Sequence, residues 1–372
     1  MTGVPTSICA FVGFAGEGPA EAPRQVFSWA EYEGLFGGLD GGELGYAVHG
    51  FFENGGGEAW IVRVAGEAAP DGLALTGDER AGTGLYALAS VDLFNLLCLP
   101  DLRRLDGPAH LAAAEAAAAY CRARRAFLIL DPPGAIATVE QAQAWIQTSA
   151  PALGSANTSY AAAYWPEPII ADPRAGAAPR RVAASGIMAG IYVSTDLERG
   201  VWKAPAGTSL AMAGVIDLAV RLNDAENALI NPLGLNALRV FPVYGALPWG
   251  ARTLQGADLL ASDWKYVPVR RTALLIEESL RRGLAWSASE PNREPLWNLV
   301  RLQAGAFMND LFRQGAFAGA TPRDAYFVHC DATTTTQSDI DAGIVNLVVG
   351  FAPSRAAEFV VLQIQLSAAP PD

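Results

Sequence analysis

The sequence predicts an α/β N-terminal unit with a parallel-rich mixed sheet, followed by an α+β C-terminal unit. Over the first 165 residues, short apolar runs of strand length alternate with helical stretches, the order typical of a parallel sheet covered by helices. From about residue 231, two long amphipathic helices come first and three strands follow. A chain of 372 residues exceeds the usual length of a single domain. We therefore expect two domains, at 1–230 and 231–372.

Strands of the first domain are expected where apolar runs end near proline or glycine. The predicted strands occupy residues 8–13, 59–64, 93–99, 126–130 and 160–164. The predicted helices occupy residues 28–37, 44–52, 108–125, 139–148, 183–193 and 210–229. Ser28 is the expected N-cap of the first helix, because Glu31 stands at the capping-box position and Gly37 supplies a C-terminal stop. Residues 66–84 show little periodicity and are expected to form a loop or a small excursion.

The second domain is expected to begin with a helix at 267–283, where two glutamates stand four residues before two arginines. Further predicted elements are a helix at 292–315, a short helical turn at 321–322, and strands at 326–330, 343–351 and 358–366. The last strand alternates, with Val360, Leu362, Ile364 and Leu366 on one face. Because it lies near the chain end, it is free to pair with its own sheet or with the edge of another molecule.

Composition and charge exclude several classes of function. The net charge of −12 argues against a nucleic-acid partner and against an anionic membrane surface, since both need clustered Lys and Arg. Apolar runs stay at strand length, well short of a membrane span, and no export leader is recognisable at the N-terminus. The cysteines are far apart and apolar in context, so we expect free buried thiols in a reducing compartment.

The motifs that resemble catalytic or cofactor-binding sites are better explained as turns and strand residues. The glycines at 13, 16 and 18 have the wrong spacing for a dinucleotide loop, and Pro19 denies an immediate helix. His329 and Cys330 are neighbours on a predicted strand and therefore point to opposite faces. The aspartates at 339 and 341 lack the remaining ligands of a calcium loop. We predict no catalytic, cofactor-binding or metal-binding residue and no cofactor. An enzyme on a doubly wound sheet is the rival class, and it would need converging polar groups in a pocket.

Short blocks along nearly the whole chain resemble the contractile tail sheath family of phage tails and related injection systems, in the same order and at similar spacing. In the second domain these blocks are Asn231–Arg239, Trp249–Leu254, Asp263–Val267, Ile276–Ser279, Glu290–Trp297, Gln314–Gly319, Thr333–Thr335, Asp339–Gly343 and Ala357–Val361. In the first domain they are Gly3–Ser7, Ala10–Gly13, Phe36–Gly38, Gly45–Ala47, Asn54–Gly56, Ile61–Val64 and Gly200–Gly207. A single block is weak evidence, whereas this many in register is strong.

The resemblance implies a structural subunit and not an enzyme. Members of the family form six-fold rings that stack helically around an inner tail tube, and the sleeve shortens and widens to drive the tube through a target envelope. The implied partners are further copies of the chain, the tube protein, and baseplate and terminator proteins, with no nucleic acid and no membrane. The implied location is the bacterial cytoplasm during assembly, and then a phage tail or phage-tail-like particle. Contraction requires an interface with two stable arrangements.

Two sets of residues are candidates for contacts in such an assembly. Terminal strands of the family add to sheets of neighbouring subunits, so we predict that the inter-subunit strand comprises Phe359, Val360, Val361, Leu362, Gln363 and Ile364. The candidates for facing the tube are Arg270, Arg271, Arg281 and Arg282, with solvated helix ends as the alternative.

The chain departs from the family pattern at two places. Members usually carry some twenty residues before the block that begins here at Gly3, so the donating N-terminal arm is expected to be largely absent. Three explanations stay open: a short paralogue that caps the sleeve or contacts the baseplate, a sequence shortened to stop polymerisation, or connection through the C-terminal arm alone. The excursion at 66–84 is short where many relatives insert an outer domain, so a compact subunit is expected.

Overall fold

The computed structural model describes all residues except 41, 67–71, 355–358 and 370–372, and it divides into two compact units. We call Thr6–Arg270 the α/β unit, and Met1–Pro5 together with Arg271–Asp372 the C-terminal unit. Most of the predicted excursion at 66–84 is described, but residues 67–71 lie outside the described residues, as do residues 357 and 358 of the last resembling block.

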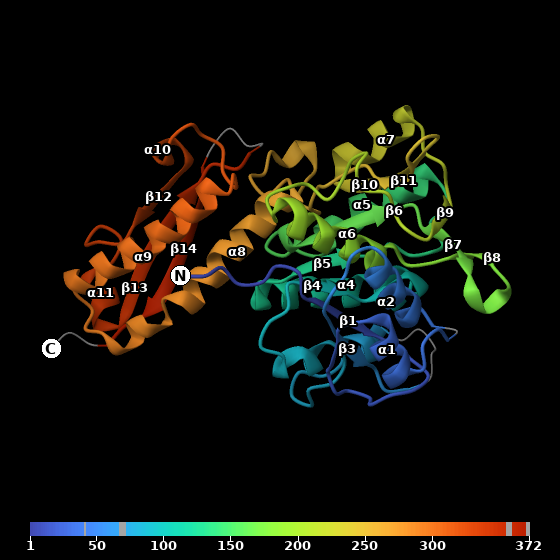
Figure 1. The fold of residues 1–372 in the computed structure, drawn as a ribbon, viewed down its shortest axis with the longest axis horizontal. Helices are drawn as coiled ribbons and strands as arrows, with labels where there is room; N and C mark the ends of the chain where they lie inside the picture. The colour runs from blue at the N-terminus through green and yellow to red at the C-terminus, as the bar shows by residue number, and fades with distance from the viewer. Residues whose placement is uncertain (41, 67–71, 355–358, 370–372) are drawn as a thin grey trace. The chain divides into compact units, whose positions relative to one another are not determined.

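The α/β unit is built on an eight-stranded sheet in which the six inner strands run parallel (Figure 1). From edge to edge the strands are β11 (Gly245–Pro248), β10 (Leu235–Phe241), β6 (Ala161–Trp165), β5 (Phe127–Leu130), β4 (Leu96–Cys98), β1 (Cys9–Gly13), β3 (Ala59–Arg63) and β2 (Arg24–Val26). The outer strands β11 and β2 are antiparallel to their neighbours. This topology confirms the predicted parallel-rich mixed sheet.

Helices cover both faces of this sheet, which is why its inner strands are apolar along their whole length. Every residue of β1, β4, β5 and β6 is buried. The helices of the unit are α1 (Trp29–Phe36), α2 (Leu44–Glu53), α3 (Gly72–Thr76), α4 (Gly107–Arg124), α5 (Val139–Ala152), α6 (Ala184–Arg199) and α7 (Asp224–Ile230). Small side chains of α4, such as Ala114 and Ala118, pack on one face with α5. On the other face Phe11 contacts Phe51 of α2, and Phe127 contacts Tyr192 of α6.

A small second sheet in the α/β unit corrects the expectation of a helix at 210–229. This sheet consists of β7 (Pro168–Asp172), β8 (Ala178–Arg181) and β9 (Val215–Leu218), in the order β8-β7-β9. Residues 215–218 form a strand because two β-branched residues begin this segment and pair with β7. The helix α7 begins only at Asp224, where Asn223 and Glu226 form a capping box.

The C-terminal unit packs helices on a three-stranded antiparallel sheet (Figure 1). The sheet has the order β12 (Tyr326–His329), β13 (Ile344–Phe351) and β14 (Val360–Ser367). The helices are α8 (Val267–Gly283), which begins in the α/β unit, α9 (Glu294–Arg313), α10 (Pro322–Ala325) and α11 (Gln337–Asp341). The N-terminal residues belong to this unit, since the Val4 amide donates to the Ser279 hydroxyl at 3.0 Å.

The compact units divide the chain at a different place from the predicted domains. The predicted second domain includes residues 231–270, but they contribute β10 and β11 to the large sheet of the α/β unit. The physical reason is strand pairing, because Leu235 to Ala237 run parallel to Ala163 to Trp165 of β6. No helix within the described residues combines the length and the apolar character that a membrane crossing needs.

Candidate functional site

The strand β14 lies at an edge of the C-terminal sheet and has the alternating pattern that the sequence predicts. Val360, Leu362 and Ile364 are buried on the side of the helices, whereas Val361 is 50% exposed and Gln363 is exposed. Phe359, at the start of the predicted inter-subunit strand, lies just before β14 and is 38% exposed. One side of β14 pairs with β13 along its whole length, from Val360 to Ser367. In the described part of the chain no strand pairs with its other side.

The free edge of β14 is limited at its C-terminal end. The Ser287 hydroxyl donates to the Ser367 carbonyl at 2.8 Å, and the backbone N–H of Asn292 donates to the Ala369 carbonyl at 3.1 Å. The backbone N–H of Ala368 donates to the Gly343 carbonyl, just before β13. In an antiparallel pair the N–H groups alternate in direction, so those of residues 360, 362, 364 and 366 also point toward β13. The N–H groups of residues 361, 363 and 365 therefore point toward the free edge.

The four arginines proposed to face a tube separate into two pairs. Arg270 and Arg271 are each 4% exposed, and the Arg270 guanidinium lies 3.8 Å from the ring centre of Tyr160 and 4.2 Å from that of Trp264. Their burial leaves no guanidinium surface for a partner, so we remove both from the tube-facing set. Arg281 and Arg282 keep partly exposed side chains at the end of α8.

Glu278 holds the exposed pair in place. Its carboxylate accepts hydrogen bonds from Arg281 at 2.7 Å and from Arg282 at 2.5 Å, so the predicted Glu278–Arg282 pair forms. Burial alone would raise the pKa of Glu278, but the two guanidinium groups lower it below its usual value. The two guanidinium groups therefore stay partly exposed at the end of α8, beside Glu277 and Glu278.

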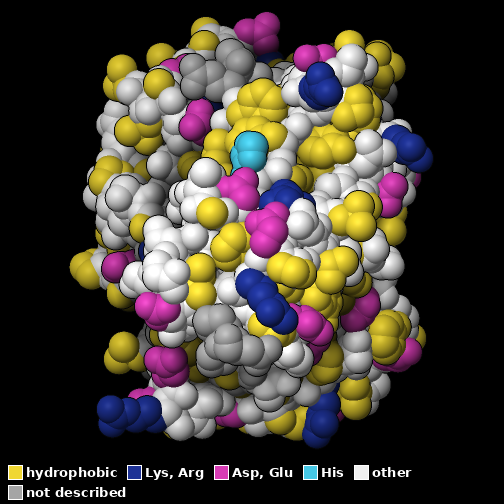
Figure 2. Space-filling view, turned by 90° about the vertical axis from the view of Figure 1, so that its left-hand side faces the viewer, with side chains coloured by type: hydrophobic (Ala, Val, Ile, Leu, Met, Phe, Trp, Pro, Cys, Tyr) yellow, Lys and Arg dark blue, Asp and Glu magenta, His cyan; other side chains and the backbone are white. Residues whose placement is uncertain are grey.

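Figure 2 shows that the face bearing the C-terminal unit mixes hydrophobic side chains with both signs of charge. A surface of this kind suits contacts made by side chains and strand edges together, because no single field of charge dominates it.

On β12, His329 is exposed, whereas Cys330 directly after the strand is fully buried. The two side chains therefore do not meet. All four cysteines are free and buried, as predicted.

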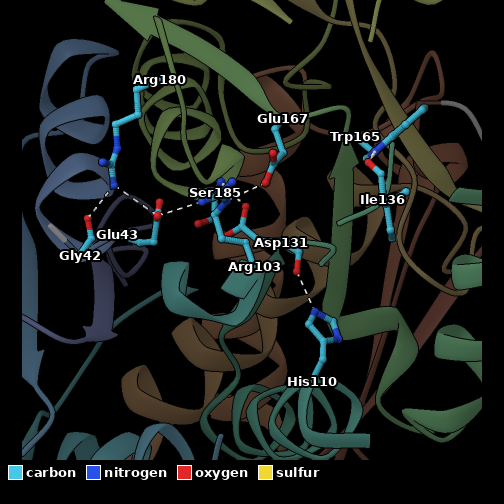
Figure 3. Close-up of polar contacts among 10 residues, drawn as sticks. All are labelled: Gly42, Glu43, Arg103, His110, Asp131, Ile136, Trp165, Glu167, Arg180 and Ser185. Carbon is cyan, nitrogen blue, oxygen red and sulfur yellow. Dashed lines mark hydrogen bonds and ion pairs between the residues drawn. The ribbon is translucent and has the colours of Figure 1, made fainter. Parts of the chain in front are cut away.

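A second cluster, which the sequence analysis missed, lies at the carboxyl ends of the parallel strands (Figure 3). Asp101 follows β4 in the short helix η2 (Pro100–Arg104), Asp131 follows β5, Glu167 follows β6, and Glu43 directly precedes α2. All four carboxylates are at most 9% exposed. Arg103 bonds Glu43 at 2.8 Å and Glu167 at 2.6 Å. The signal in the sequence was an acidic residue shortly after each of three apolar strands.

Ligands of open α/β sheets bind at this edge, so the cluster is the place where an enzyme would be expected to work. Burial raises the pKa of Asp131 to about 7 and that of Asp101 to about 6, which is also seen at catalytic carboxylates. A pocket of about 250 Å³ lies elsewhere, between α2 and the β7–β8 hairpin, where Tyr46, His49 and Glu53 line it. Within the described residues, no three His, Cys, Asp or Glu side chains are placed to hold a metal ion. The geometry of the cluster is that of a buried support for the fold.

Comparison with known proteins follows the same lines. Residues 261–367 match the family described as the phage tail sheath C-terminal domain. A prophage major tail sheath protein of Pseudomonas aeruginosa (strain UCBPP-PA14) is 29% identical over 320 residues, which cover 81% of this chain and 75% of that protein.

Two solved structures extend the likeness to nearly the whole chain. The helical sheath of the anti-feeding prophage in its contracted state is 30% identical, with a TM-score of 0.77 over 97% of this chain and 93% of that one. A chain in the baseplate of the same particle, in the contracted state, is 25% identical, with a TM-score of 0.80 over 97% of this chain and 94% of that one.

The fold and these likenesses together define a structural component of a phage tail or phage-tail-like particle. Its relatives are sheath proteins that serve as structural parts. The chain belongs to the contractile tail sheath family, as a sheath subunit of a phage-like contractile system.

Proposed function

We propose that copies of this chain stack as six-membered rings around an inner tube and contract to drive that tube through a target envelope. The observation that carries this proposal is the free edge of β14. Its outward N–H groups at 361, 363 and 365 can donate hydrogen bonds to a strand from a neighbouring copy. The relative in a contracted helical sheath supports the same arrangement. The role is structural and not catalytic, and assembly takes place in the bacterial cytoplasm.

Strand addition suits a sleeve that changes its dimensions. Main-chain hydrogen bonds join the copies through an extended segment, so neighbouring bodies can shift while the link persists. Buried side chains at Val360, Leu362 and Ile364 fix the register of β14 in its own sheet. The partly exposed Arg281 and Arg282 are the proposed contacts with the tube.

The test of strand addition is the substitution Gln363→Pro in the full chain. Proline removes one N–H from the free edge without removing a hydrogen bond to β13, and the side chain at 363 is exposed. We expect a folded subunit with an unchanged circular dichroism spectrum that no longer forms sleeves in electron micrographs. The matched control is Gln363→Thr, which keeps the N–H and suits a strand. Sleeves formed by Gln363→Pro at the yield of the control would contradict the proposal.

A second role is favoured by the likeness to a chain of a contracted baseplate, with a TM-score of 0.80. In that role the chain is a short sheath paralogue that caps an end of the sleeve or contacts the baseplate and terminator proteins. Electron microscopy of the purified chain with its tube protein separates the two roles. Long sleeves support the main sheath subunit, whereas single rings or monomers support the terminal position.

A further inference from the structure

Four buried carboxylates and one shared arginine tie together separate segments of the α/β unit. Figure 3 shows Arg103 with the carboxylates of Glu43, Asp131 and Glu167. Arg103 donates to Oε1 of Glu43 and to Oε1 of Glu167, and so joins the start of α2 to the segment between β6 and β7. Asp131 accepts the Ser185 amide at 2.9 Å, near the N-terminus of α6. Asp101 accepts the Phe14 amide at 2.9 Å, directly after β1.

The same cluster holds the base of the small sheet β8-β7-β9. Glu167 directly precedes β7, and Arg180 of β8 donates to Glu43 at 3.4 Å. The Arg180 guanidinium also lies 4.0 Å from the ring centre of Tyr46 in α2. The Tyr46 hydroxyl donates to Asp172, at the end of β7, at 2.8 Å. The attachment of the small sheet to α2 therefore combines the contacts of Tyr46 with a Glu43 carboxylate that Arg103 and Arg180 share.

The cluster is short of partners for its carboxylate oxygens. Four oxygens are buried and accept no hydrogen bond in the described part of the chain: Glu43 Oε2, Asp101 Oδ1, Asp131 Oδ2 and Glu167 Oε2. An ionised carboxylate in such a position is costly, and a bound proton removes most of that cost.

The positive charges around the cluster come from arginines. The other groups that face it are Tyr32 of α1, Cys98 of β4, Arg103 and Arg104 of η2, His110 of α4, Arg180 of β8 and Ser185 of α6. Burial lowers the pKa of His110, so this ring is neutral near neutral pH. With all four carboxylates ionised, the negative charges outnumber the three arginines.

We propose that this cluster is a proton-operated latch, in which protons on Asp101 and Asp131 strengthen the Glu43–Arg103–Glu167 bridge that holds the small sheet. When the protons leave, the Asp131 carboxylate attracts Arg103 in competition with Glu43 and Glu167. The Asp101 carboxylate then also repels Glu43. The latch loosens as the solution becomes more alkaline.

The direction of the pH effect follows from linkage. Burial raises the pKa of both aspartates above the value of about 3.9 in an unfolded chain, so the folded protein binds these protons more tightly. Their stabilising effect is complete below about pH 4 and is lost as the pH rises through about 6 for Asp101 and about 7 for Asp131. The α/β unit is therefore more stable in mild acid than in mild alkali, which is opposite to a protein stabilised by ordinary surface ion pairs.

Hydrogen exchange in the full chain tests the latch. Amide exchange of β7 and β8 is measured at about pH 5.5 and about pH 8.5 and corrected for the intrinsic rate of exchange. We expect the opening equilibrium of these strands to be at least about tenfold larger at the higher pH. The variant Asp101→Asn with Asp131→Asn keeps an acceptor at each position but cannot titrate, and it should remove the difference. The control is Asp263→Asn on the exposed surface, which should retain it.

A measurement on the unaltered protein keeps the proposal open to refutation if the double variant does not fold. Protonated carboxylic acids give an infrared carbonyl band that ionised ones lack, and other carboxylates are ionised at mildly acid pH. We expect this band at about pH 5.5 and its loss by about pH 8.5. Absence of the band at the lower pH overturns the proposal, as does a pH effect on β7 that survives in the double variant.

Discussion

Arg270 is a charged side chain that the fold uses as a core residue. Its guanidinium lies between the rings of Tyr160 and Trp264, at 3.8 Å and 4.2 Å from their centres. We expect Arg270→Ala to lower the free energy of unfolding by about 2–4 kcal/mol, since packing and cation–π attraction are lost together. Arg270→Lys should recover less than half of this loss, because an ammonium group does not stack flat between two rings. Urea denaturation measures both.

The control for this prediction is Arg281→Ala, whose side chain is 45% exposed. Its partner Glu278 is buried but still pairs with Arg282 after this change, so we expect a loss of about 1 kcal/mol or less. If Arg270→Ala costs no more than Arg281→Ala, the stacked guanidinium has no special role.

The sequence places both arginines on one helix but does not separate them, because the ring of Tyr160 comes from a distant segment of the chain. Local signals were more informative, and the predicted N-cap at Ser28 is confirmed by its bond from the Glu31 amide at 3.2 Å.

The contact between α2 and α6 depends on glycines that bring the two helices together. A Cβ atom at Gly186 would lie 2.1 Å from the Ala47 carbonyl oxygen, and one at Gly190 would lie 2.5 Å from the Phe51 carbonyl oxygen. Backbone atoms cannot retreat as a flexible side chain can, so we expect Gly186→Ala to lower the free energy of unfolding by about 2–4 kcal/mol. Thermal denaturation followed by circular dichroism measures the loss.

Gly305 in α9 gives the matched control, because a Cβ atom there would meet no atom within 4 Å. Gly305→Ala should raise the stability by about 0.5–1 kcal/mol through helix propensity alone. Opposite signs for two identical substitutions in helices are the expected result. If Gly186→Ala changed the free energy of unfolding as Gly305→Ala does, the two helices would be free to move apart.

At the scale of elements, the sequence predicts best where one local rule governs the structure. Fully apolar strands such as β5 and the alternating strand β14 are found where expected, because burial on two faces or on one face leaves a clear pattern. The strands β7, β8 and β10 were missed, since each is short, irregular in polarity, or begins after a proline or glycine turn. Their pairing is decided by distant strands. The carboxylate cluster was missed for the same reason, as its members come from four separate segments.

For the molecule as a whole, assembly requires contacts with two kinds of partner, and the edge of β14 accounts only for contacts between copies. The chain has a net charge of −12, and Arg281 and Arg282 place two partly exposed guanidinium groups at the end of α8. A complementary acidic tube would be held there by steering and pairing of charges. Reversing both arginines would leave Glu278, which is 5% exposed, without its partners, and would confuse binding with folding.

The cleaner change is therefore Arg281→Gln and Arg282→Gln together with Glu278→Gln, which keeps hydrogen-bonding groups and leaves no buried charge unpaired. We expect retention of the matching tube protein in a pull-down to fall by at least about tenfold, and the remaining binding to depend less on salt. Glu278→Gln alone should bind the tube as the unaltered chain does, because both cations remain. Undiminished binding by the triple variant would remove the end of α8 from the tube interface and leave its arginines as a solvated helix end.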